Sequence, residues 1–386
     1  MEWLAGLVGL WLVVDSLKIV REGLRFERHS KELFFQSENT EDAPKTSVII
    51  AALNEEEKLP QCLDSLVLQD HPKLEVILIN DRSTDESGSI MQAYCQKNER
   101  WKYVQIHELP EGWLGKTHAL HQGSRLATGE YFIFSDADVV FSKDCTRKAS
   151  LIASQNRIDH LSLGPRFIAK NSLLQAMLLY FGMMILRLFH PSRMGKRANA
   201  YVGVGAFNLV NAALYKELQG HESLRLCVLD DIMLAKLFSK ANSRQAFVDG
   251  RKFLSIEWYA SVGEMIRGLE KNSFAALRYS WLRLIGVYSI NLLFHLLPYT
   301  LLLFSNDSGQ GLLLSGLLLS HLVFAVSAFK TGYSPMLTFI YPLAGLLLGW
   351  TQLRSGILTS QRKEIRWRNT AYTVETLKSF AEENNL

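Results

Sequence analysis

Cysteine is scarce in this chain of 386 residues, and the few cysteines present do not cluster. Cys62, Cys95, Cys145 and Cys227 form no CxxC pair, and the histidines are scattered as well. This spacing argues against a structural zinc site and favours a reducing compartment, although it leaves disulfides open. Glycine-rich loops of the types GxxxxGK(S/T) and GxGxxG are also missing after the first predicted strand. A phosphate cradle built from backbone amides is therefore not encoded there.

Charged residues are almost absent from residues 284–353, where Asp307 and Lys330 are the only two. The preceding part, residues 21–283, has the composition of a soluble domain, so the net charge of +4 averages over two different regions. Each of three apolar segments approaches the roughly 20 residues that cross about 30 Å of hydrocarbon. These segments are residues 284–304, 311–329 and 335–353. We therefore predict a transmembrane region over residues 284–353, because three core helices in succession would overfill one core.

Residues 1–20 are apolar and are followed by basic residues, the reverse of the order in a cleavable signal peptide. We predict an N-terminal membrane anchor with its basic side in the cytoplasm. The protein is then a multi-pass membrane protein with a cytoplasmic middle domain, in the cell inner membrane if the source is bacterial. Because the anchor is short and contains Asp15, a helix lying in the interface is the alternative.

The basic C-terminal tail, residues 354–386, complicates this topology. Its positive charge favours the cytoplasm, whereas three crossings after a cytoplasmic domain would place it on the other side. Either one of the apolar segments is re-entrant or the first of them does not cross the membrane.

Between these apolar regions, predicted strands alternate with predicted helices. Continuous apolar runs suited to buried strands, and apolar residues at helical spacing, distinguish the two. The predicted strands are residues 47–53, 74–81, 101–109 and 131–138, and the predicted helices are residues 55–69, 83–97 (capped by Ser83) and 117–129. This alternation predicts an α/β fold with a mostly parallel central sheet, which binds ligands at the carboxyl ends of its strands.

Polar side chains stand at the ends of these predicted strands: Asn54 and Glu55, then Asp81, then Asp136 and Asp138. Two aspartates one residue apart are disfavoured inside a strand, so the chain is expected to turn there and aim both carboxylates into one pocket. Carboxylates repel phosphate unless a divalent cation lies between them. We therefore predict Mg²⁺ or Mn²⁺ at Asp138 and Asp136, holding a diphosphate leaving group. A solvated turn is the alternative for an isolated Asp-Ala-Asp triplet.

Four segments, in order, resemble the inverting family 2 glycosyltransferases of GT-A fold: AALNEEEKLPQCLDSL, LINDRSTDES, EGWLGKTHALHQGSRLATGEYFIFSDADVVF and CVLDDIMLAKLF. The resemblance covers about residues 47–281. The stretches GWLGKTHAL and EIRWRNTAY are similar to the membrane-bound branch that glycosylates lipids such as carotenoids, hopanoids and ceramide. The resemblance implies a GT-A nucleotide-sugar-binding domain at residues 43–283. It also implies transfer of one hexose, from a UDP-linked donor, to a hydroxyl or carboxyl of a lipid at the cytoplasmic membrane face.

The resemblance also implies a role for each residue on the donor side. Asp81 would contact uridine, and Asn54 and Glu55 would line the same base and ribose pocket. The family usually has two acidic residues where this chain has Asn80 followed by Asp81, so the first partner is altered. Lys116 would reach the nucleotide or its diphosphate, a role that suits its positive charge. A solvated surface lysine is the alternative.

At the reaction centre, the resemblance places Asp136 near the ribose and the metal, and Asp138 as the direct metal ligand. Inversion by a single displacement needs one carboxylate to take the proton of the acceptor hydroxyl. Adjacent residues at a helix start point about 100° apart, so only one of Asp230 and Asp231 can face the sugar. The family pattern puts the base second, at Asp231, and leaves Asp230 to cap the following helix.

Processive members of the family carry a Gln-x-x-Arg-Trp signature, and residues 266–284 hold only Arg278 and Trp281, in the wrong order. A single transfer is therefore favoured over a processive polysaccharide synthase. Transfer to polyprenyl phosphate and an inactive nucleotide- or lipid-binding relative remain as alternatives, and no nucleic acid is expected as a partner. Residues 202–221 resemble the segment that shapes the acceptor side, which makes His221 a candidate contact. Residues 173–189 are predicted to form either a core helix or an interfacial helix.

Overall fold

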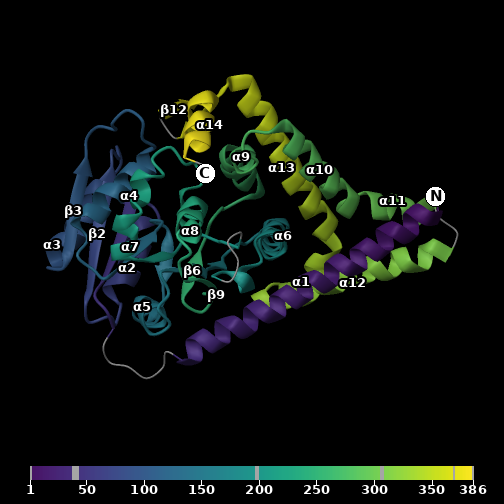
Figure 1. Ribbon diagram of the computed structural model, residues 1–386, viewed down its shortest axis with the longest axis horizontal. Helices are drawn as coiled ribbons and strands as arrows, with labels where there is room; N and C mark the ends of the chain where they lie inside the picture. Colours follow the sequence, from purple (N-terminus) through teal and green to yellow (C-terminus); the bar gives the residue numbers. More distant parts are fainter. Residues whose placement is uncertain (1, 37–42, 196–199, 305–307, 368–369, 385–386) are drawn as a thin grey trace. The chain divides into compact units, whose positions relative to one another are not determined.

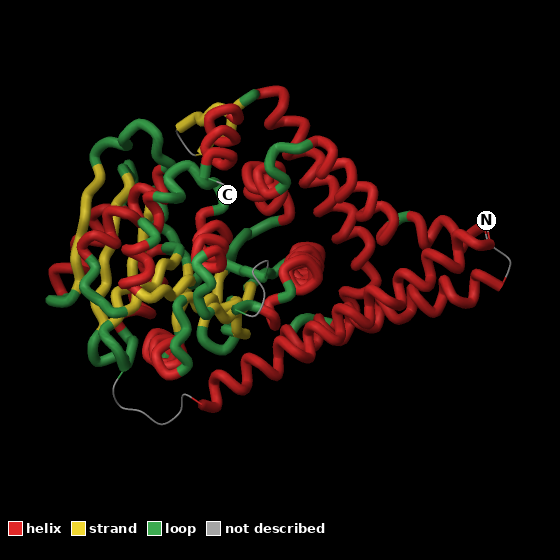
Figure 2. The backbone as a smooth tube through the Cα atoms, viewed as in Figure 1, coloured by secondary structure: helices red, strands yellow, loops and turns green. Residues whose placement is uncertain are grey.

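The computed structural model describes residues 2–36, 43–195, 200–304, 308–367 and 370–384. Its contacts divide the chain into two compact units. The sheet unit comprises Arg25–Ile168, Phe189–Trp258 and Phe380–Leu386. The helical unit comprises Met1–Leu24, Ala169–Leu188 and Tyr259–Ser379. The long strands all lie in the sheet unit, and the described part of the helical unit adds one short hairpin to its helices (Figure 2).

The sheet unit is built on a seven-stranded sheet with the order β3-β2-β1-β4-β8-β6-β9 (Figure 1). Its strands are β1 (Thr46–Ala52), β2 (Leu74–Asp81), β3 (Trp101–Ile106), β4 (Tyr131–Ser135), β6 (His160–Gly164), β8 (Asn208–Asn211) and β9 (Gln245–Asp249). β3, β2, β1 and β4 run parallel to one another, as do β6 and β9, whereas β8 is antiparallel to both of its neighbours. The mostly parallel sheet and the four predicted strands are confirmed.

Helices cover both faces of this sheet. The helices on one face are α2 (Leu59–Val67), α3 (Ser87–Lys97) and α5 (Cys145–Gln155), and those on the other are α4 (Gly115–Leu126) and α7 (Ala212–Glu217). In β1, Val48 and Ile50 join the core shared with α2 and α5, whereas Ile49 lies against Gly123 of α4. The continuous apolar runs therefore form strands that are buried on both faces, as α/β packing requires.

The predicted start of helix α3 is wrong by four residues. The helix begins at Ser87, and Ser83 belongs to the loop before it. The Ser83 hydroxyl accepts the Asn54 backbone N–H at 3.1 Å, and the Ser83 N–H donates to Asn80 Oδ1 at 3.0 Å. Ser83 therefore ties the loop after β1 to the loop after β2 instead of capping a helix.

The predicted turn after β4 is present. β4 ends at Ser135, and the chain resumes as β5 (Val139–Phe141) in a different, three-stranded sheet. That sheet has the order β5-β10-β7, with β10 at Leu254–Ile256 and β7 at Arg166–Phe167. Asp136, Ala137 and Asp138 thus form the short connection between two sheets, which explains how a strand-forming run tolerates two carboxylates.

The helical unit contains long apolar helices. Its elements are α1 (Glu2–Gln36, up to Leu24), α6 (Ser172–Phe189, up to Leu188), α9 (Val262–Ala276), α10 (Trp281–His295), α11 (Leu297–Phe304), α12 (Ser308–Thr331), α13 (Tyr341–Arg362), the hairpin β11 (Glu364–Trp367) and β12 (Thr370–Thr373), and α14 (Val374–Glu383, up to Ser379). It includes residues 169–188 and 259–283, which lie inside the range 43–283 that was assigned to the glycosyltransferase-like domain.

Four helices in the described residues are long and apolar enough to cross a membrane: Trp3–Phe34, Ser172–Arg193, Gly309–Thr331 and Pro335–Arg362. The predicted segment 284–304 forms two helices, α10 and α11, which are bent by 43° and count as a fifth candidate if they make one broken span. A bend of this size also suits a re-entrant loop, one of the two solutions proposed for the topology. Residues 173–189 were predicted to form either a core helix or an interfacial helix. They lie in one of the four helices that are long and apolar enough to cross a membrane.

Small residues allow the helices of this unit to approach one another closely. A Cβ atom on Gly9 of α1 would lie 2.5 Å from the backbone of Leu312 in α12, and one on Gly316 would lie 2.6 Å from the Gly9 carbonyl oxygen. Large apolar side chains on the same helices point outward, such as Leu7 at 63% and Leu318 at 62% exposure. Close backbone contact inside and an apolar surface outside are the packing expected of helices in lipid.

Candidate active site

The connection after β4 is held by the backbone of a loop before β8. The Asp136 N–H donates to the Gly205 carbonyl at 3.0 Å, and the Ser135 hydroxyl donates to the Ala206 carbonyl at 2.8 Å. A Cβ atom on Gly205 would lie 2.5 Å from Asp136 Oδ2, so glycine is required for this approach. The position and direction of the Asp136 carboxylate are therefore fixed by a segment about 70 residues away in the sequence.

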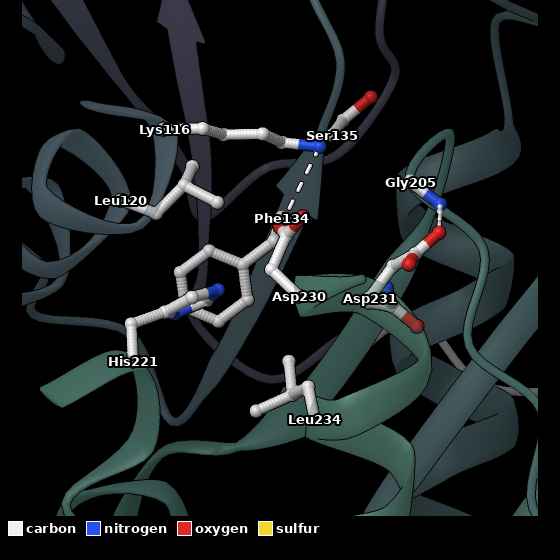
Figure 3. Close-up of a pocket in the computed structure, with 10 residues that line it drawn as sticks. Lys116, Leu120, Phe134, Ser135, Gly205, His221, Asp230, Asp231 and Leu234 are labelled. Atoms are coloured by element: carbon white, nitrogen blue, oxygen red, sulfur yellow. Dashed lines mark hydrogen bonds and ion pairs between the residues drawn. The ribbon is translucent and has the colours of Figure 1, made fainter. Parts of the chain in front are cut away.

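Lys116, at the start of α4, joins two of the predicted carboxylates, and Figure 3 shows its contact with one of them, Asp230. Its Nζ lies 2.7 Å from Asp136 Oδ1 and 3.5 Å from Asp230 Oδ2. Burial opposes the charge of this lysine, but the attraction of Asp136 and Asp230 outweighs it and raises the pKa of Lys116. The ammonium group therefore stays charged, and it links the ends of β4 and the start of helix α8 (Asp230–Lys240) in one place.

Asp230 and Asp231 are the first two residues of α8, and their side chains do different things. The N-cap is Leu229, with no side-chain bond, so the expectation that Asp230 caps this helix is wrong. Asp230 pairs with Lys116 instead. Asp231 is oriented by backbone amides: its Oδ2 accepts the Gly205 N–H at 2.8 Å and its Oδ1 accepts its neighbour's N–H at 2.8 Å.

Near neutral pH, burial keeps the Asp231 carboxyl protonated in a substantial part of the molecules. Desolvation, and then repulsion from Asp230, raises the pKa of Asp231 to about 7, while Lys116 opposes the shift. Desolvation also raises the pKa of Asp230, again against the pull of Lys116. A carboxylate with a pKa near the working pH is suited to general base catalysis, because it is available ionised and still attracts a proton.

Asp138 lies on the other side of the connection, beside a lysine that the sequence analysis did not single out. Lys58 Nζ is 3.7 Å from Asp138 Oδ2 and donates to the Glu257 carbonyl at 2.9 Å. Burial, followed by repulsion from Asp136, raises the pKa of Asp138 to about 7, and Lys58 only partly offsets this. A further cation would offset the repulsion that Asp138 experiences from Asp136.

No group of three or more His, Cys, Asp or Glu side chains in the described residues could hold a metal ion on its own. The protein therefore supplies at most the two carboxylates Asp136 and Asp138 here. Mg²⁺ and Mn²⁺ are commonly held by one or two carboxylates together with substrate phosphates, so this donor set matches a cation that arrives with a diphosphate.

The loops after β1 and β2 are joined by hydrogen bonds between backbone N–H groups of one loop and side chains of the other. Asn54 adopts a left-handed conformation with φ of 55°, and its Oδ1 accepts the Thr84 N–H at 2.8 Å. The Glu55 N–H donates to the Ser87 hydroxyl at 2.8 Å. Asn54 and Glu55 are thus brought beside the β2 loop, as the sequence predicts for strand ends at one edge of a sheet.

Asp81 lies next to the start of α4. A Cβ atom on Gly115 would lie 2.5 Å from Asp81 Oδ2, so the glycine before Lys116 allows α4 to begin against this carboxylate. The Asp81 Oδ1 also accepts a bond from Arg82 Nε at 2.8 Å. Its neighbour Asn80 stands where the family usually has an acidic residue. Asn80 is buried and hydrogen-bonded to Gln105 at 2.8 Å, so its side chain joins β2 to the edge strand β3.

A pocket lies between these segments (Figure 3). Its lining residues are Lys116, Leu120, Phe134, Ser135, Gly205, Asn208, His221, Asp230, Asp231 and Leu234. Sequence reasoning named Lys116, Asp230 and Asp231 for catalysis or donor binding, and treated His221 as a weak candidate. It missed Gly205 and Asn208, although the glycines of the stretch VGVGAFN were a visible signal of close backbone approach.

A scan against protein-family models matches residues 47–210 to the family described as "Glycosyl transferase family 2". The 4,4'-diaponeurosporenoate glycosyltransferase of Staphylococcus haemolyticus is 25% identical over 260 residues, which cover 67% of this chain and 68% of that protein. The enzyme of the same name from Staphylococcus aureus is 26% identical over 221 residues, and the match spans only 56% of its length and 55% of this chain.

Among solved structures, the fold is similar to that of a mannosyltransferase from Pyrobaculum calidifontis in complex with GDP-Man and Mn²⁺. The TM-score is 0.52 at 16% sequence identity, and the match covers 93% of this chain and 100% of the other. This likeness, together with the sheet topology, identifies a GT-A-like α/β fold with a mostly parallel central sheet.

Proposed function

We propose that the chain is a family 2 glycosyltransferase, as its match to that family model and its curated relatives support. It moves one hexose from a nucleotide sugar, a UDP-hexose, to a lipid at the cytoplasmic membrane face, with inversion at the anomeric carbon. The domain at residues 43–283 performs the reaction. The anchor at 1–20 and the apolar region at 284–353 hold it at the membrane, with the basic tail 354–386 on the same side as the active site.

One observation carries this proposal: Lys116 bridges Asp136 and Asp230. A single-displacement glycosyltransferase must hold the leaving diphosphate on one side of the anomeric carbon and the base on the other. The end of β4, proposed for the diphosphate, and the start of α8, proposed for the base, meet at this lysine. An arrangement in which these two segments lay far apart would be incompatible with direct transfer.

On the donor side, Asn54, Glu55 and Asp81 line the site for the base and ribose, and Asp136 lies between the ribose and the diphosphate. Asp138 is the direct ligand of Mg²⁺ or Mn²⁺, with Asp136 beside it. The repulsion that raises the pKa of Asp138 supports this assignment, because a divalent cation would relieve it. When bound, the cation would neutralise charge on the departing diphosphate. Lys116 Nζ adds a fixed positive charge next to it.

The reaction itself needs one carboxylate from the chain. The acceptor oxygen forms a bond to the anomeric carbon while the bond from that carbon to the diphosphate breaks, and the electron pair leaves with the nucleotide. Asp231 takes the proton when the acceptor is a hydroxyl. The hydrogen bonds that Asp231 accepts from the backbone N–H groups of Gly205 and Ile232 fix the plane of its carboxylate. They leave a free lone pair on each carboxylate oxygen.

The lipid acceptor is supported by two features. The curated relatives are named for glycosylation of 4,4'-diaponeurosporenoate, a carotenoid-type carboxylate. Four helices of this chain are also long and apolar enough to enter a membrane. A carboxylate acceptor is already ionised near pH 7 and does not need a base, whereas a hydroxyl does. The raised pKa of Asp231 is more useful to a hydroxyl acceptor, so the response to loss of Asp231 distinguishes the two.

The test uses the full chain in detergent or lipid nanodiscs with total lipid extract, Mn²⁺ and radiolabelled UDP-glucose, UDP-galactose or GDP-mannose. The expected result is label in the organic phase, with one hexose per lipid by mass spectrometry and an inverted anomeric configuration by NMR. An untargeted comparison of glycolipids from cells with and without the gene should show the same product. Donor binding without any lipid product from either experiment would instead favour an inactive relative.

A further inference from the structure

We propose that His221 is a specificity-determining residue that forms a hydrogen bond between its Nε2 and a hydroxyl group of the transferred sugar. This inference rests on the proposed function, because it identifies a contact within the same site. His221 follows the first residue of a short 3-10 helix, Gly220–Glu222, and lines the pocket that also contains Lys116 and Asp231 (Figure 3).

The imidazole ring of His221 is held in one orientation. Its Nδ1 lies 2.8 Å from the Tyr215 hydroxyl, and the same hydroxyl accepts the His221 backbone N–H at 3.1 Å. The ring packs edge-to-face on Phe134 with 4.6 Å between centroids. Both Tyr215 and Phe134 are buried, so the ring cannot turn without breaking these contacts. The tyrosine thus holds both the backbone and the ring of His221.

The hydrogen bond to Tyr215 leaves the other ring nitrogen available. Nδ1 lies 2.8 Å from the Tyr215 hydroxyl, and that hydroxyl accepts the His221 backbone N–H. Burial, and then the nearby charge of Lys116, lowers the pKa of His221 to about 3, so the ring is neutral and carries one proton. In a neutral imidazole one nitrogen donates and the other accepts, so Nε2 can form a hydrogen bond in either tautomer.

The described residues provide no hydrogen-bond partner for Nε2. The residue as a whole is 1% exposed, but Nε2 itself is accessible from the pocket that His221 lines. A sugar hydroxyl both donates and accepts, so it can pair with Nε2 whichever ring nitrogen carries the proton. An oxygen of whatever enters the pocket is the natural partner.

The backbone before His221 is strained in a way that serves its position. Gln219 has φ of 56° and Gly220 has φ of 30°, and left-handed conformations are unfavourable for residues other than glycine. A Cβ atom on Gly220 would lie 2.1 Å from the Tyr215 ring, so no other residue is accommodated there. The turn therefore presses Gly220 against the tyrosine that orients His221. Strain of this kind is found where the surrounding structure must place one residue.

The position in the pocket identifies the sugar, and not the nucleotide, as the partner. The pocket contains the proposed base Asp231 and the two residues that pair across it, Lys116 and Asp230. Asn54 and Asp81, proposed for the base and ribose, do not line it. The anomeric carbon must lie next to Asp231, so the ring hydroxyls of the sugar are the closest acceptors to His221.

The experiment compares the affinities of UDP and UDP-glucose for the full chain with Mn²⁺ by isothermal titration calorimetry; if the transfer assay selects GDP-mannose, GDP and GDP-mannose replace them. His221→Phe keeps an aromatic ring in place and removes the ring nitrogens that can form hydrogen bonds. We expect it to leave UDP affinity unchanged and to lower the affinity gain due to the sugar by about tenfold, or about 1.4 kcal/mol. His221→Gln keeps an N–H donor and should recover part of this gain. His121→Phe is the matched control, because His121 packs on Trp113 and does not line the pocket.

Deoxygenated donors then identify the hydroxyl. One deoxy analogue should bind wild-type protein about tenfold more weakly than the parent donor and should bind His221→Phe no more weakly than the parent does. A sugar-dependent gain that stays within twofold in both His221→Phe and His221→Gln overturns the inference, and it shows that water satisfies Nε2. The proposed function fails separately, if wild-type protein neither binds nor transfers any hexose. Thermal unfolding of each variant confirms that the protein is folded.

Discussion

The two units of this protein treat buried charge in opposite ways. In the helical unit, two part-buried carboxylates are matched or outnumbered by cations: Asp15 of α1 pairs with Arg187 of α6 at 2.7 Å, and Glu270 of α9 lies 3.2 Å from both Arg354 and Arg362 of α13. The sheet unit places four carboxylates beside two lysines, namely Asp136, Asp138, Asp230 and Asp231 beside Lys116 and Lys58. A balanced pair holds two helices together and has little reason to bind anything else. An unbalanced group is stable only when some carboxylates stay protonated or another cation arrives.

Uncharged polar groups repeat this difference. In the helical unit, the Tyr180 hydroxyl and His295 Nε2 are 2.8 Å apart, and Asn291 donates to the Gly345 carbonyl at 2.9 Å. These bonds join one helix directly to another. In the sheet unit, Tyr215 fixes the His221 ring through Nδ1, and Nε2 has no hydrogen-bond partner among the described residues. These two hydrogen bonds of the helical unit serve helix packing, whereas we propose that His221 Nε2 serves the substrate.

The largest effect is expected from Asp231→Asn, which removes the proposed base from the unbalanced group. Turnover with a hydroxyl acceptor should fall by about 10²–10⁴-fold, because the proton has no carboxylate to receive it. Donor affinity should change little, since the amide retains an oxygen for the Gly205 N–H. Initial rates and donor titrations measure the two quantities. Asp230→Asn is the control and should weaken donor binding through Lys116.

Turnover that survives in Asp231→Asn with a hydroxyl acceptor would move the base elsewhere. With a carboxylate acceptor, however, the expected loss is much smaller, because no proton has to be removed. The ratio of the two losses, measured in one preparation, therefore reports the chemical class of the acceptor as well as the role of Asp231.

The next effect concerns the balanced pair. Arg187→Met leaves the Asp15 carboxylate without its cation among apolar helices, and it should destabilise the protein by about 3 kcal/mol. Removing both partners with Arg187→Met and Asp15→Leu should recover most of that loss. Thermal unfolding in detergent measures the cycle, and Lys18→Met, an exposed lysine of α1, is the control. A double variant as unstable as the single one would show that the charges themselves are not what holds the helices.

The sequence predicted those parts of the fold that local patterns determine. The four strands β1, β2, β3 and β4 were found because burial on both faces requires continuous apolar runs of this kind, although β3 and β4 end three residues earlier than predicted. The turn at Asp136 was found because two carboxylates interrupt a strand. Residues 284–304 were predicted as one segment, because hydropathy does not record the 43° bend between α10 and α11.

Contacts between distant segments could not be predicted in the same way. Asp230 was expected to cap α8, but Lys116 comes from α4, more than 100 residues earlier, and pairs with it instead. Gly205 was missed because its need for glycine arises from Asp136, about 70 residues earlier, and its N–H binds Asp231, 26 residues later. Local propensity contains no information on such pairings, since they form only when the sheet brings the segments together.

A smaller effect is expected from Asp138→Asn, which removes one charge from the unbalanced group. Stabilisation of the protein by Mn²⁺ should be lost, and affinity for UDP-glucose with Mn²⁺ should fall by about 10–100-fold, because the direct ligand of the cation is gone. Thermal shifts with and without Mn²⁺ and calorimetry measure this. Asp144→Asn is a suitable control, because Asp144 pairs with Lys148 at 2.7 Å, away from the pocket. Persistent metal-dependent binding in Asp138→Asn would refute the ligand assignment.

The smallest effect is a dependence of stability on pH. Burial raises the pKa of both Asp138 and Asp231 from 3.8 to about 7, so the folded protein binds protons more tightly than the unfolded chain does. The stabilising contribution of these groups is fully present below about pH 4 and is lost as pH rises through about 7. Metal-free protein should therefore lose about 1 kcal/mol or more between pH 5.5 and 7.5 from each group, since one pKa unit is worth about 1.4 kcal/mol.

Buried histidines work in the other direction over part of this range. Burial lowers the pKa of His160 to about 4, so the unfolded chain takes up the extra proton and stability rises as pH increases toward 6.5. The carboxylate contribution is therefore measured as the difference between wild-type protein and Asp138→Asn, in which the histidines cancel. That difference should shift in favour of the variant between pH 5.5 and pH 7.5 as Asp138 ionises, and saturating Mn²⁺ should stabilise only wild-type protein at the higher pH. A difference that does not vary with pH would mean that Asp138 ionises normally, and the unbalanced group would then need no external cation.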